Sequence, residues 1–273
     1  MRRFLVLLLS LCSVAMVMAK GSEKVVMKAV KSNLAFTKVA AAPAIKLIVE
    51  ERSEGNIIIR ATERIIDDVK LEVKGGELTV SYKKDMDFKG KNGHSFAEVY
   101  IPYNGKLSSF TAAVASIIDV KPTLNVKSLN IECLGASKIK LNAVAESANI
   151  EAVGASSVTA DIVCTKIDCE LAGASNATIS GSATKAEFEI VGASSLKAAG
   201  FKASQLEADI AGASKAEMCA EMADVEVAGA SKANIECITL LKADASGSST
   251  IIYSGGCRVD IENNSGASTI KKL

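Results

Sequence analysis

Apolar and polar residues alternate along most of the chain, and Gly-Ala-Ser interrupts the alternation at regular intervals. Eight such corners occur, one of them Gly-Ser-Ser, and their glycines are 19, 19, 19, 20, 17, 18 and 19 residues apart. Apolar residues stand two, four and six positions before most of these glycines, and four and six positions after them. A period of two predicts strands, so one repeat is strand, tight corner, strand and return loop. The corner glycines are Gly135, Gly154, Gly173, Gly192, Gly212, Gly229, Gly247 and Gly266.

Repeats of this length predict a stack of coils. A single pair of strands is only marginally stable, whereas stacked copies pair every strand with its counterpart and close a continuous core. We therefore expect an all-β fold, a parallel β-helix-like solenoid whose two sheets are joined by tight Gly-Ala-Ser turns, with coils of about 19 residues. Glycine suits the corner because neighbouring coils leave little room there and the chain turns sharply.

The serine of each corner is predicted to be structural. Stacking would align the serines in a ladder whose hydroxyls bond one another or the corner backbone. A nucleophile needs a neighbouring base, and the sequence places none beside these repeated residues. The ladder consists of Ser137, Ser156, Ser175, Ser194, Ser214, Ser231, Ser249 and Ser268.

Two places depart from the regular repeat. Val114-Ala115-Ser116 stands about one repeat length before the first full corner and resembles a degenerate copy of it. In the last repeat, Val259 and Ile261 are out of phase by one position, which predicts an inserted residue or a bulge near Asn263 and Asn264.

Residues 20–110 lack the repeat but still have the pattern of strands. Alternation over Ile45–Glu51 predicts one strand, and Gly75-Gly76 between two alternating runs predicts a hairpin that ends at Tyr82. No linker rich in proline or serine separates this part from residues 111–273. We expect the N-terminal β segment to be continuous with the solenoid.

Residues 1–19 have the composition of a signal peptide. Two arginines precede an apolar stretch over residues 4–18, and Val17 and Ala19 are small residues at the positions that signal peptidase recognises. The stretch is short for a membrane anchor, and Leu11 before Cys12 disfavours lipidation. We predict cleavage after Ala19, export, and no transmembrane span afterwards.

Composition excludes several classes of function. Lysine and arginine number 32 against 31 aspartates and glutamates, so no overall field attracts nucleic acid or anionic lipid. Tryptophan is absent, aromatic residues make up 4% and there is one histidine, which leaves few groups for acid–base chemistry or metal binding. We expect no enzyme, no cofactor, no metal and no nucleic-acid partner.

Six cysteines follow the predicted signal peptide. An even number in an exported protein permits disulfides. Their positions mostly coincide with the apolar phase of the alternation, which favours buried free thiols, and their spacing does not predict zinc. They are Cys133, Cys164, Cys169, Cys219, Cys237 and Cys257.

Acidic residues recur three positions before the corners, at Glu132, Glu151, Glu170, Glu189, Asp209 and Glu226. Such a ladder could hold cations loosely, but interleaved lysines favour a solvated face.

Aromatic residues concentrate between positions 82 and 110, beside a polar loop. If the protein has a ligand site with aromatic side chains, this is the predicted place; the alternative is that the rings cap the core at one end of the solenoid. The candidate binding residues are Tyr82, Phe88, His94, Tyr100 and Tyr103.

Several segments resemble a known family. The succession Phe36-Thr37-Lys38-Val39, the segment from Asp68 to Val80, the strand Val99-Tyr100-Ile101-Pro102 and the serial Gly-Ala-Ser corners are similar to the putative auto-transporter adhesin family with a head GIN domain. The resemblance implies an exported protein of Gram-negative bacteria, located in the periplasm or at the cell surface. It also implies a two-sheeted β-helix and no catalytic residues, with adhesion inferred from the fold.

We therefore expect a non-enzymatic exported binding or adhesion protein that presents its solenoid faces to an unknown protein or glycan of a cell surface or envelope. A carbohydrate-active or carbohydrate-binding solenoid resembling polysaccharide lyases is the first alternative. A self-associating structural component of the envelope, and thus a homo-oligomer, is the second.

Overall fold

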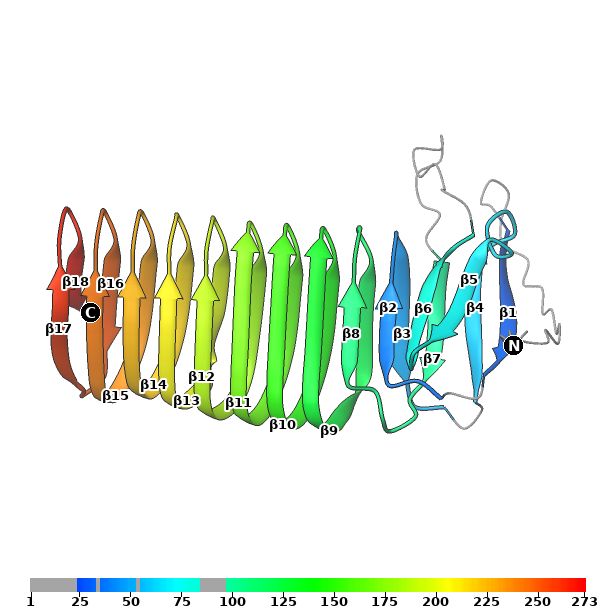
Figure 1. Cartoon of the computed structure of the whole chain (residues 1–273), viewed down its shortest axis with the longest axis horizontal. Coiled ribbons are helices and arrows are strands. Elements are labelled where there is room, and N and C mark those ends of the chain that lie inside the picture. The colour runs from blue at the N-terminus through cyan, green and yellow to red at the C-terminus, as the bar shows by residue number, and fades with distance from the viewer. Residues whose placement is uncertain (1–23, 33–34, 53–54, 84–96) are drawn as a thin grey trace.

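A computed structural model describes residues 24–32, 35–52, 55–83 and 97–273, which form eighteen strands and no helix. The strands build a long rod, with the first strands at one end and the last at the other (Figure 1). The predicted signal peptide, Phe88 and His94 lie outside the described residues. Within the described part, no helix has the length and apolar character needed to cross a membrane.

The strands fall into three groups along the chain. Eight short strands come first: β1 (Val25–Lys31), β2 (Lys38–Ala41), β3 (Ile45–Glu50), β4 (Asn56–Thr62), β5 (Val69–Lys74), β6 (Glu77–Tyr82), β7 (Ala97–Pro102) and β8 (Ser109–Ala112). Seven long strands follow: β9 (Ile117–Gly135), β10 (Lys138–Gly154), β11 (Ser157–Gly173), β12 (Asn176–Ile190), β13 (Ser195–Ile210), β14 (Lys215–Val227) and β15 (Lys232–Ala245). The last coils contain β16 (Thr250–Ser254), β17 (Arg258–Asn264) and β18 (Thr269–Lys272).

Each long strand bends midway, so that its two legs belong to two different sheets. The first leg of β10, residues 138–144, pairs in parallel with residues 157–163 of β11, and the second leg, residues 147–154, pairs with residues 166–173. The second legs form the front sheet, which faces the viewer in Figure 1, and the first legs form the back sheet behind it. The predicted all-β solenoid with two sheets is confirmed, and so is the predicted coil length, because Ser157 pairs with Lys138 on one side and Asn176 on the other.

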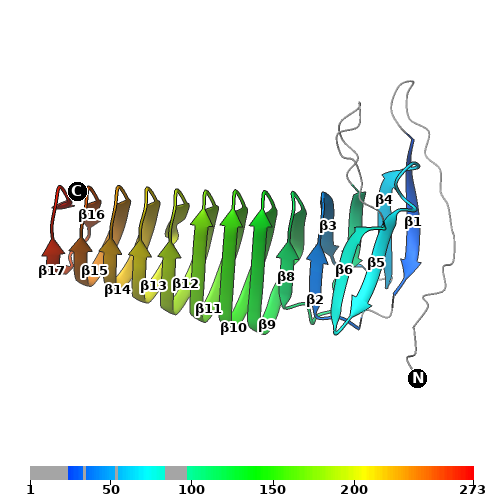
Figure 2. The ribbon, with the colours of Figure 1, turned by 45° about the horizontal axis from the view of Figure 1, so that its top comes forward.

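The N-terminal strands extend both sheets. Strands β8, β2 and β6 add to the front sheet, and β3 and β7 add to the back sheet, all in parallel. At the end of the rod the direction changes, because β4 pairs antiparallel with β7 and with β1. The hairpin of β5 and β6 turns at Gly75 and Gly76, which both have positive φ. Figure 2 shows β1, β4 and β5 inclined across this end.

The core lies between the two sheets and follows the alternation. In β10 the inward side chains include Ile139 and Leu141 from the first leg and Ile150 from the second, all at most 2% exposed. Burying each side chain of this size contributes about 1.5–3 kcal/mol relative to leaving it in water. Alanines take the remaining inward places and keep the two sheets close.

The Gly-Ala-Ser corners stack directly on one another. Gly212 has a φ of +87°, and a Cβ at this position would lie 2.4 Å from the carbonyl oxygen of Gly192 in the preceding coil. The same oxygen accepts a hydrogen bond of 2.7 Å from the Ala213 N–H. Glycine is therefore required both by the backbone angle and by the distance between coils.

The degenerate copy forms the corner that precedes Gly135, and the turn between β2 and β3 stacks on it, because the Ala44 N–H donates to the Val114 carbonyl at 2.9 Å. Val114 and Ala115 have φ angles of 52° and 62°, and the Ser116 N–H donates to Ser137 Oγ at 3.2 Å. The preceding chain leaves space here, since 62% of Val114 is exposed. The side chain of Val114 therefore does not crowd a glycine of the neighbouring coil.

Local bulges adjust coils of unequal length. The register between β9 and β10 shifts beside Pro122, where the proline has no N–H to pair. In the last coil Ala243 pairs with Ile261 but Asp244 pairs with Asn263, so Glu262 is the extra residue. The bulge predicted near Asn263 is thus found one residue earlier.

Candidate functional site

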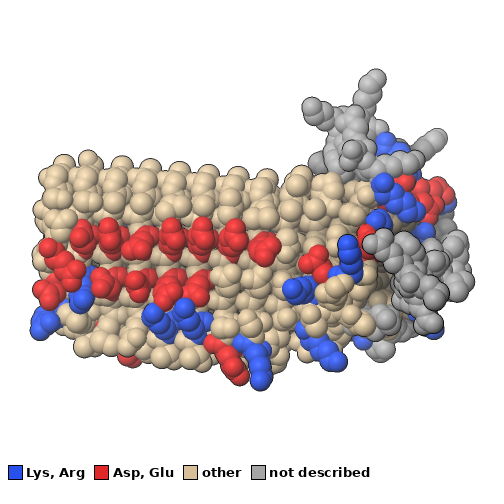
Figure 3. Space-filling model, viewed as in Figure 1, with Lys and Arg blue, Asp and Glu red and all other residues tan. Residues whose placement is uncertain are grey.

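Two rows of carboxylates cover the outer face of the front sheet (Figure 3). They arise because the second legs alternate and because the register repeats from coil to coil, so that Glu151 pairs with Glu132 and with Glu170. The first row consists of Glu132, Glu151, Glu170, Glu189, Asp209, Glu226 and Asp244. The second row consists of Asp168, Glu187, Glu207 and Asp224.

The first row is almost free of compensating charge. Glu132, at one end, accepts hydrogen bonds from Thr111 Oγ1 at 3.2 Å and Asn130 Nδ2 at 3.0 Å, and Asp244, at the other end, accepts one from Asn263 Nδ2 at 3.1 Å. The five carboxylates between them make no hydrogen bond or ion pair with another side chain of the described residues. Like charges side by side on a sheet are destabilising, at about 0.8 kcal/mol per pair for 5 Å in water.

The second row is partly neutralised by lysines. Lys166 lies 3.2 Å from Asp168 and 3.4 Å from Glu187, and Lys185 lies 2.5 Å from Glu187. The hydrogen bond from Lys185 lowers the pKa of Glu187 to about 2. Lys242 bridges Asp224 and Glu262 near the end of the rod. The uncompensated charge of the front sheet is therefore concentrated in the first row.

The middle of the two rows surrounds a hollow of about 340 Å³. Six carboxylates of three neighbouring coils line it: Asp168, Glu170, Glu187, Glu189, Glu207 and Asp209. Within the described residues, no group of three or more aspartates, glutamates, cysteines or histidines has the arrangement of a metal site. The rows form an extended charged surface, and the hollow is one section of it.

The outer face of the back sheet has a different charge. Lysines predominate there, and the corner-proximal positions also contain serine, threonine and asparagine. The exposed lysines include Lys138, Lys140, Lys197, Lys215, Lys232 and Lys271, and the exposed acids Asp161, Glu217 and Glu236 lie among them. The back sheet thus presents a weakly basic face opposite the acidic one.

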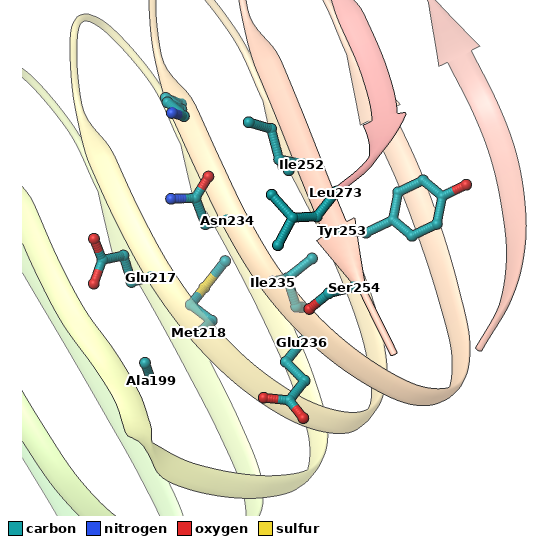
Figure 4. Close-up of a pocket in the computed structure, with 11 residues that line it drawn as sticks. Ala199, Glu217, Met218, Asn234, Ile235, Glu236, Ile252, Tyr253, Ser254 and Leu273 are labelled. Atoms are coloured by element: carbon teal, nitrogen blue, oxygen red, sulfur yellow. The ribbon is translucent and has the colours of Figure 1, made fainter. Parts of the chain in front are cut away.

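A second hollow, of about 300 Å³, lies at the outer face of the back sheet near the last coils. It forms beside a change in coil length, because the coil from Gly192 to Gly212 is longer than the coil from Gly212 to Gly229. Figure 4 shows the apolar side chains of Ile252 and Leu273 in it, with Glu217 at the other side.

Three residues of the predicted ligand site, Tyr82, Tyr100 and Tyr103, lie among the described residues, and these three have different surroundings. Tyr82 points into the core, where its hydroxyl accepts a hydrogen bond from the Ala97 N–H at 3.2 Å and burial raises its pKa. Tyr100 lies on the outer face of β7, and its hydroxyl donates to Glu98 at 3.0 Å. Tyr103 packs against the edge of the core.

Tyr100 belongs to a compact network of ion pairs. Glu98 lies 2.9 Å from Lys46 and 2.7 Å from Arg60, and the Arg52 guanidinium lies 5.5 Å from the centre of the Tyr100 ring. Partial burial raises the pKa of Glu98, but the hydrogen bonds from Lys46 and Arg60 outweigh it and lower the pKa overall. These charges satisfy one another across β3, β4 and β7.

The corner serines are buried and bonded to neighbouring coils. Ser156 Oγ lies 3.2 Å from Ser175 Oγ, and the N–H groups of Ser175 and Ser194 donate to the hydroxyl of the next serine at 3.3 Å. Ser268, in the last corner, is half-buried and donates to the Ala245 carbonyl at 3.0 Å. These bonds hold adjacent corners together.

The second row of carboxylates and Asp244 are absent from the ladder described from the sequence. The second row begins with Asn130 and Asn149 at the equivalent places, which hides the acidic pattern in the first coils. Comparing the positions five residues before each corner would have revealed it.

Comparison with known proteins agrees with this architecture. A structure of a putative adhesin from Parabacteroides distasonis superposes with a TM-score of 0.69 at 17% identity, over 93% of this chain and 98% of that one. A putative adhesin from Parabacteroides merdae gives 0.67 at 16% identity over 93% and 98%, and a putative lipid binding protein from P. distasonis gives 0.64 at 16% over 91% and 96%. At these identities the likeness establishes the fold, and no curated protein matches the sequence.

The family assignment comes from the sequence itself. Residues 35–223 match the model of the putative auto-transporter adhesin family with a head GIN domain. The match includes the N-terminal strands and most of the Gly-Ala-Ser coils, which are the segments that carried the resemblance. This chain belongs to the putative auto-transporter adhesin family with a head GIN domain.

Proposed function

We propose that this protein is an exported, non-enzymatic binding protein with an adhesin-like role, and that the acidic front sheet is its binding face. Membership of the adhesin family supports the general role and the export. The observation that carries the choice of face is the first row, in which five successive carboxylates lack a partner within the described chain. Such a surface keeps its charge available for another molecule.

The partner that fits this face is a protein segment rich in lysine and arginine. Positive side chains would meet carboxylates repeated about every 4.8 Å along the rod. Each exposed pair contributes only about 0.2–1 kcal/mol, so the affinity must come from many contacts made at once. A charged surface of one sign also attracts its partner from a distance, which speeds association at low salt.

The test is the binding of a fluorescein-labelled oligolysine, followed by fluorescence anisotropy at several salt concentrations. The front variant replaces Glu170, Glu189 and Asp209 with Gln, Gln and Asn. A matched control makes the same changes at three exposed acids of the back sheet, Asp161→Asn, Glu217→Gln and Glu236→Gln, so that both variants gain the same net charge.

We expect the front variant to weaken binding on the order of tenfold, and the control to change it less than twofold. Binding of the wild type should fall as salt shortens the range of the field. An equal loss in the two variants would mean that net charge alone matters, and unchanged binding in the front variant would exclude this face.

Self-association is a second candidate, because the lysines of the back sheet are complementary to the front sheet of another copy. Sedimentation velocity of the same proteins at low and high salt distinguishes it. A salt-sensitive dimer or fibre that is lost in the front variant would favour contact between copies.

A further inference from the structure

Two cysteines from successive coils meet near the C-terminal end of the rod. Cys237 is fully buried at the bend between the legs of β15, and Cys257 lies half-buried in the turn between β16 and β17, packed against the same core. The two residues lie on successive coils, close enough for Cys257 to raise the pKa of Cys237, and both thiols are free in the structure. The alternation in the sequence favoured separate buried thiols.

The register of the last coils holds the two residues together from both sides. On one side, Gly255 stacks on Cys237 so closely that a Cβ on the glycine would lie 2.2 Å from the Cys237 carbonyl oxygen. Only glycine permits this approach. On the other side, the Cys237 thiol lies 3.1 Å from the Leu240 carbonyl oxygen, and Leu240 pairs with Arg258, the residue after Cys257.

The remaining cysteines have other surroundings. Cys133 lies near the Ser157 carbonyl oxygen, and Cys219 stands between Lys202 and Glu236 in the sheet register. Burial raises the pKa of Cys164 to about 11 and that of Cys169 to about 12. Among the six cysteines of the described residues, Cys237 and Cys257 are the pair in which one thiol raises the pKa of the other.

We propose that Cys237 and Cys257 form a disulfide after export, and that this bond links the last coils covalently to the preceding coil. Exported proteins meet oxidising conditions, in which adjacent thiols of suitable geometry pair. Gly256 precedes Cys257 and has open space around its missing Cβ. The segment can therefore move so that the Cys257 sulfur approaches the Cys237 sulfur.

The chemistry requires a disulfide donor, either a thiol oxidoreductase or oxidised glutathione. The half-buried Cys257 is the thiol that such a donor can reach, so its thiolate attacks the donor disulfide, forms a mixed disulfide and releases one donor thiol. Burial and the neighbouring Cys257 raise the pKa of Cys237 to about 11, so Cys237 loses its proton only as it attacks the Cys257 sulfur and expels the second donor thiol. Two protein thiols become one disulfide while one donor disulfide becomes two thiols.

The bond would fix the chain directly before the last two strands. Six of the seven residues of β17 and three of the four of β18 are exposed, so these strands have little buried surface to hold them. The disulfide closes a loop of about 20 residues that contains β16, and the chain-entropy model for such a loop predicts local opening on the order of 100-fold rarer.

The test uses the full chain, incubated folded with oxidised or reduced glutathione, then unfolded with N-ethylmaleimide and digested with trypsin. Cleavage after Lys232, Lys242 and Arg258 separates residues 233–242 from residues 243–258, and each peptide contains one cysteine. We expect these peptides to appear linked after oxidation and to separate on reduction. The matched control Cys219→Ser should keep the link, and Cys257→Ser should abolish it.

Hydrogen exchange supplies an independent measurement on the same samples. Oxidation should slow exchange of the β16 amides, which lie inside the closed loop, on the order of 100-fold and leave β10 unchanged. Recovery of both cysteines as N-ethylmaleimide adducts after oxidation would overturn the proposal, as would a stable glutathione adduct on Cys257. The wild-type peptide map decides the question even if a serine variant fails to fold.

Discussion

Replacing Gly212 with alanine tests whether contact between coils, or only the backbone angle, requires glycine at the corners. Gly212 has a φ of +87° and its missing Cβ would lie 2.4 Å from the Gly192 carbonyl oxygen. Gly135 has nearly the same angle, +76°, but its nearest neighbour would be the Val114 nitrogen at 3.6 Å, an ordinary contact. Gly135→Ala is therefore a matched control that keeps the angle and removes the clash.

The two variants should differ by the cost of separating the coils. A left-handed alanine costs about 1–2 kcal/mol at either place. At Gly212 the methyl group also pushes on the oxygen that accepts the Ala213 hydrogen bond, which adds about 1 kcal/mol for the bond and about 1–3 kcal/mol for the crowding. We expect about 3–6 kcal/mol of destabilisation for Gly212→Ala and about 1–2 kcal/mol for Gly135→Ala.

Thermal unfolding measures the difference in stability between the two variants. It is followed by circular dichroism at about 218 nm, where β-structure has its negative band. For a chain of this size the gap corresponds to a melting temperature about 5–15 °C lower for Gly212→Ala than for Gly135→Ala. Equal melting temperatures for the two variants would refute the contact argument and leave the backbone angle as the sole reason for glycine.

Three further predictions concern single side chains. Glu189→Gln should stabilise the protein by about 0.2–1 kcal/mol in urea at low salt, because it removes one of the in-register like charges; a gain that persists in high salt would contradict this cause. Glu187 has its pKa lowered from 4.5 to about 2 by its lysine partners, so its stabilising effect should be complete above pH 4.5 and vanish as the pH falls to 2. Unfolding free energies of wild type and Glu187→Gln should therefore converge in acid, and parallel curves would argue against the pairing. Cys169, whose pKa burial raises to about 12, should resist iodoacetamide at pH 8 in the folded protein and react after unfolding, as peptide mass spectrometry would report; rapid labelling of the folded chain would show that the core opens there.

The sequence was sufficient to predict the coils because alternation and the corner glycine both have direct physical causes. It was not sufficient for the N-terminal end, since alternation at β4 gives a strand but not its direction, and β4 runs antiparallel to β7. The burial of Tyr82 was also hidden, because a tyrosine suits a core edge or an open face equally well.

The chemistry of the surface was partly visible in the sequence. The first row followed from its fixed distance to the corners, whereas the second row is interrupted by Asn149 and by Lys242. The proximity of Cys237 and Cys257 depends on the close stacking of Gly255, but a separation of about one coil between two cysteines is a signal that the sequence contained.

The constant register of the coils makes the length of the rod independent of its cross-section. Deleting residues 155–173 would join Gly154 to Ala174 and recreate a Gly-Ala-Ser corner, while β10 would meet the coil that β11 now meets. The rod would lose one strand spacing, about 4.8 Å, and each row would lose a single carboxylate, Glu170 from the first and Asp168 from the second. Gain or loss of whole coils can therefore change the reach of the rod in equal steps, without any redesign of the core.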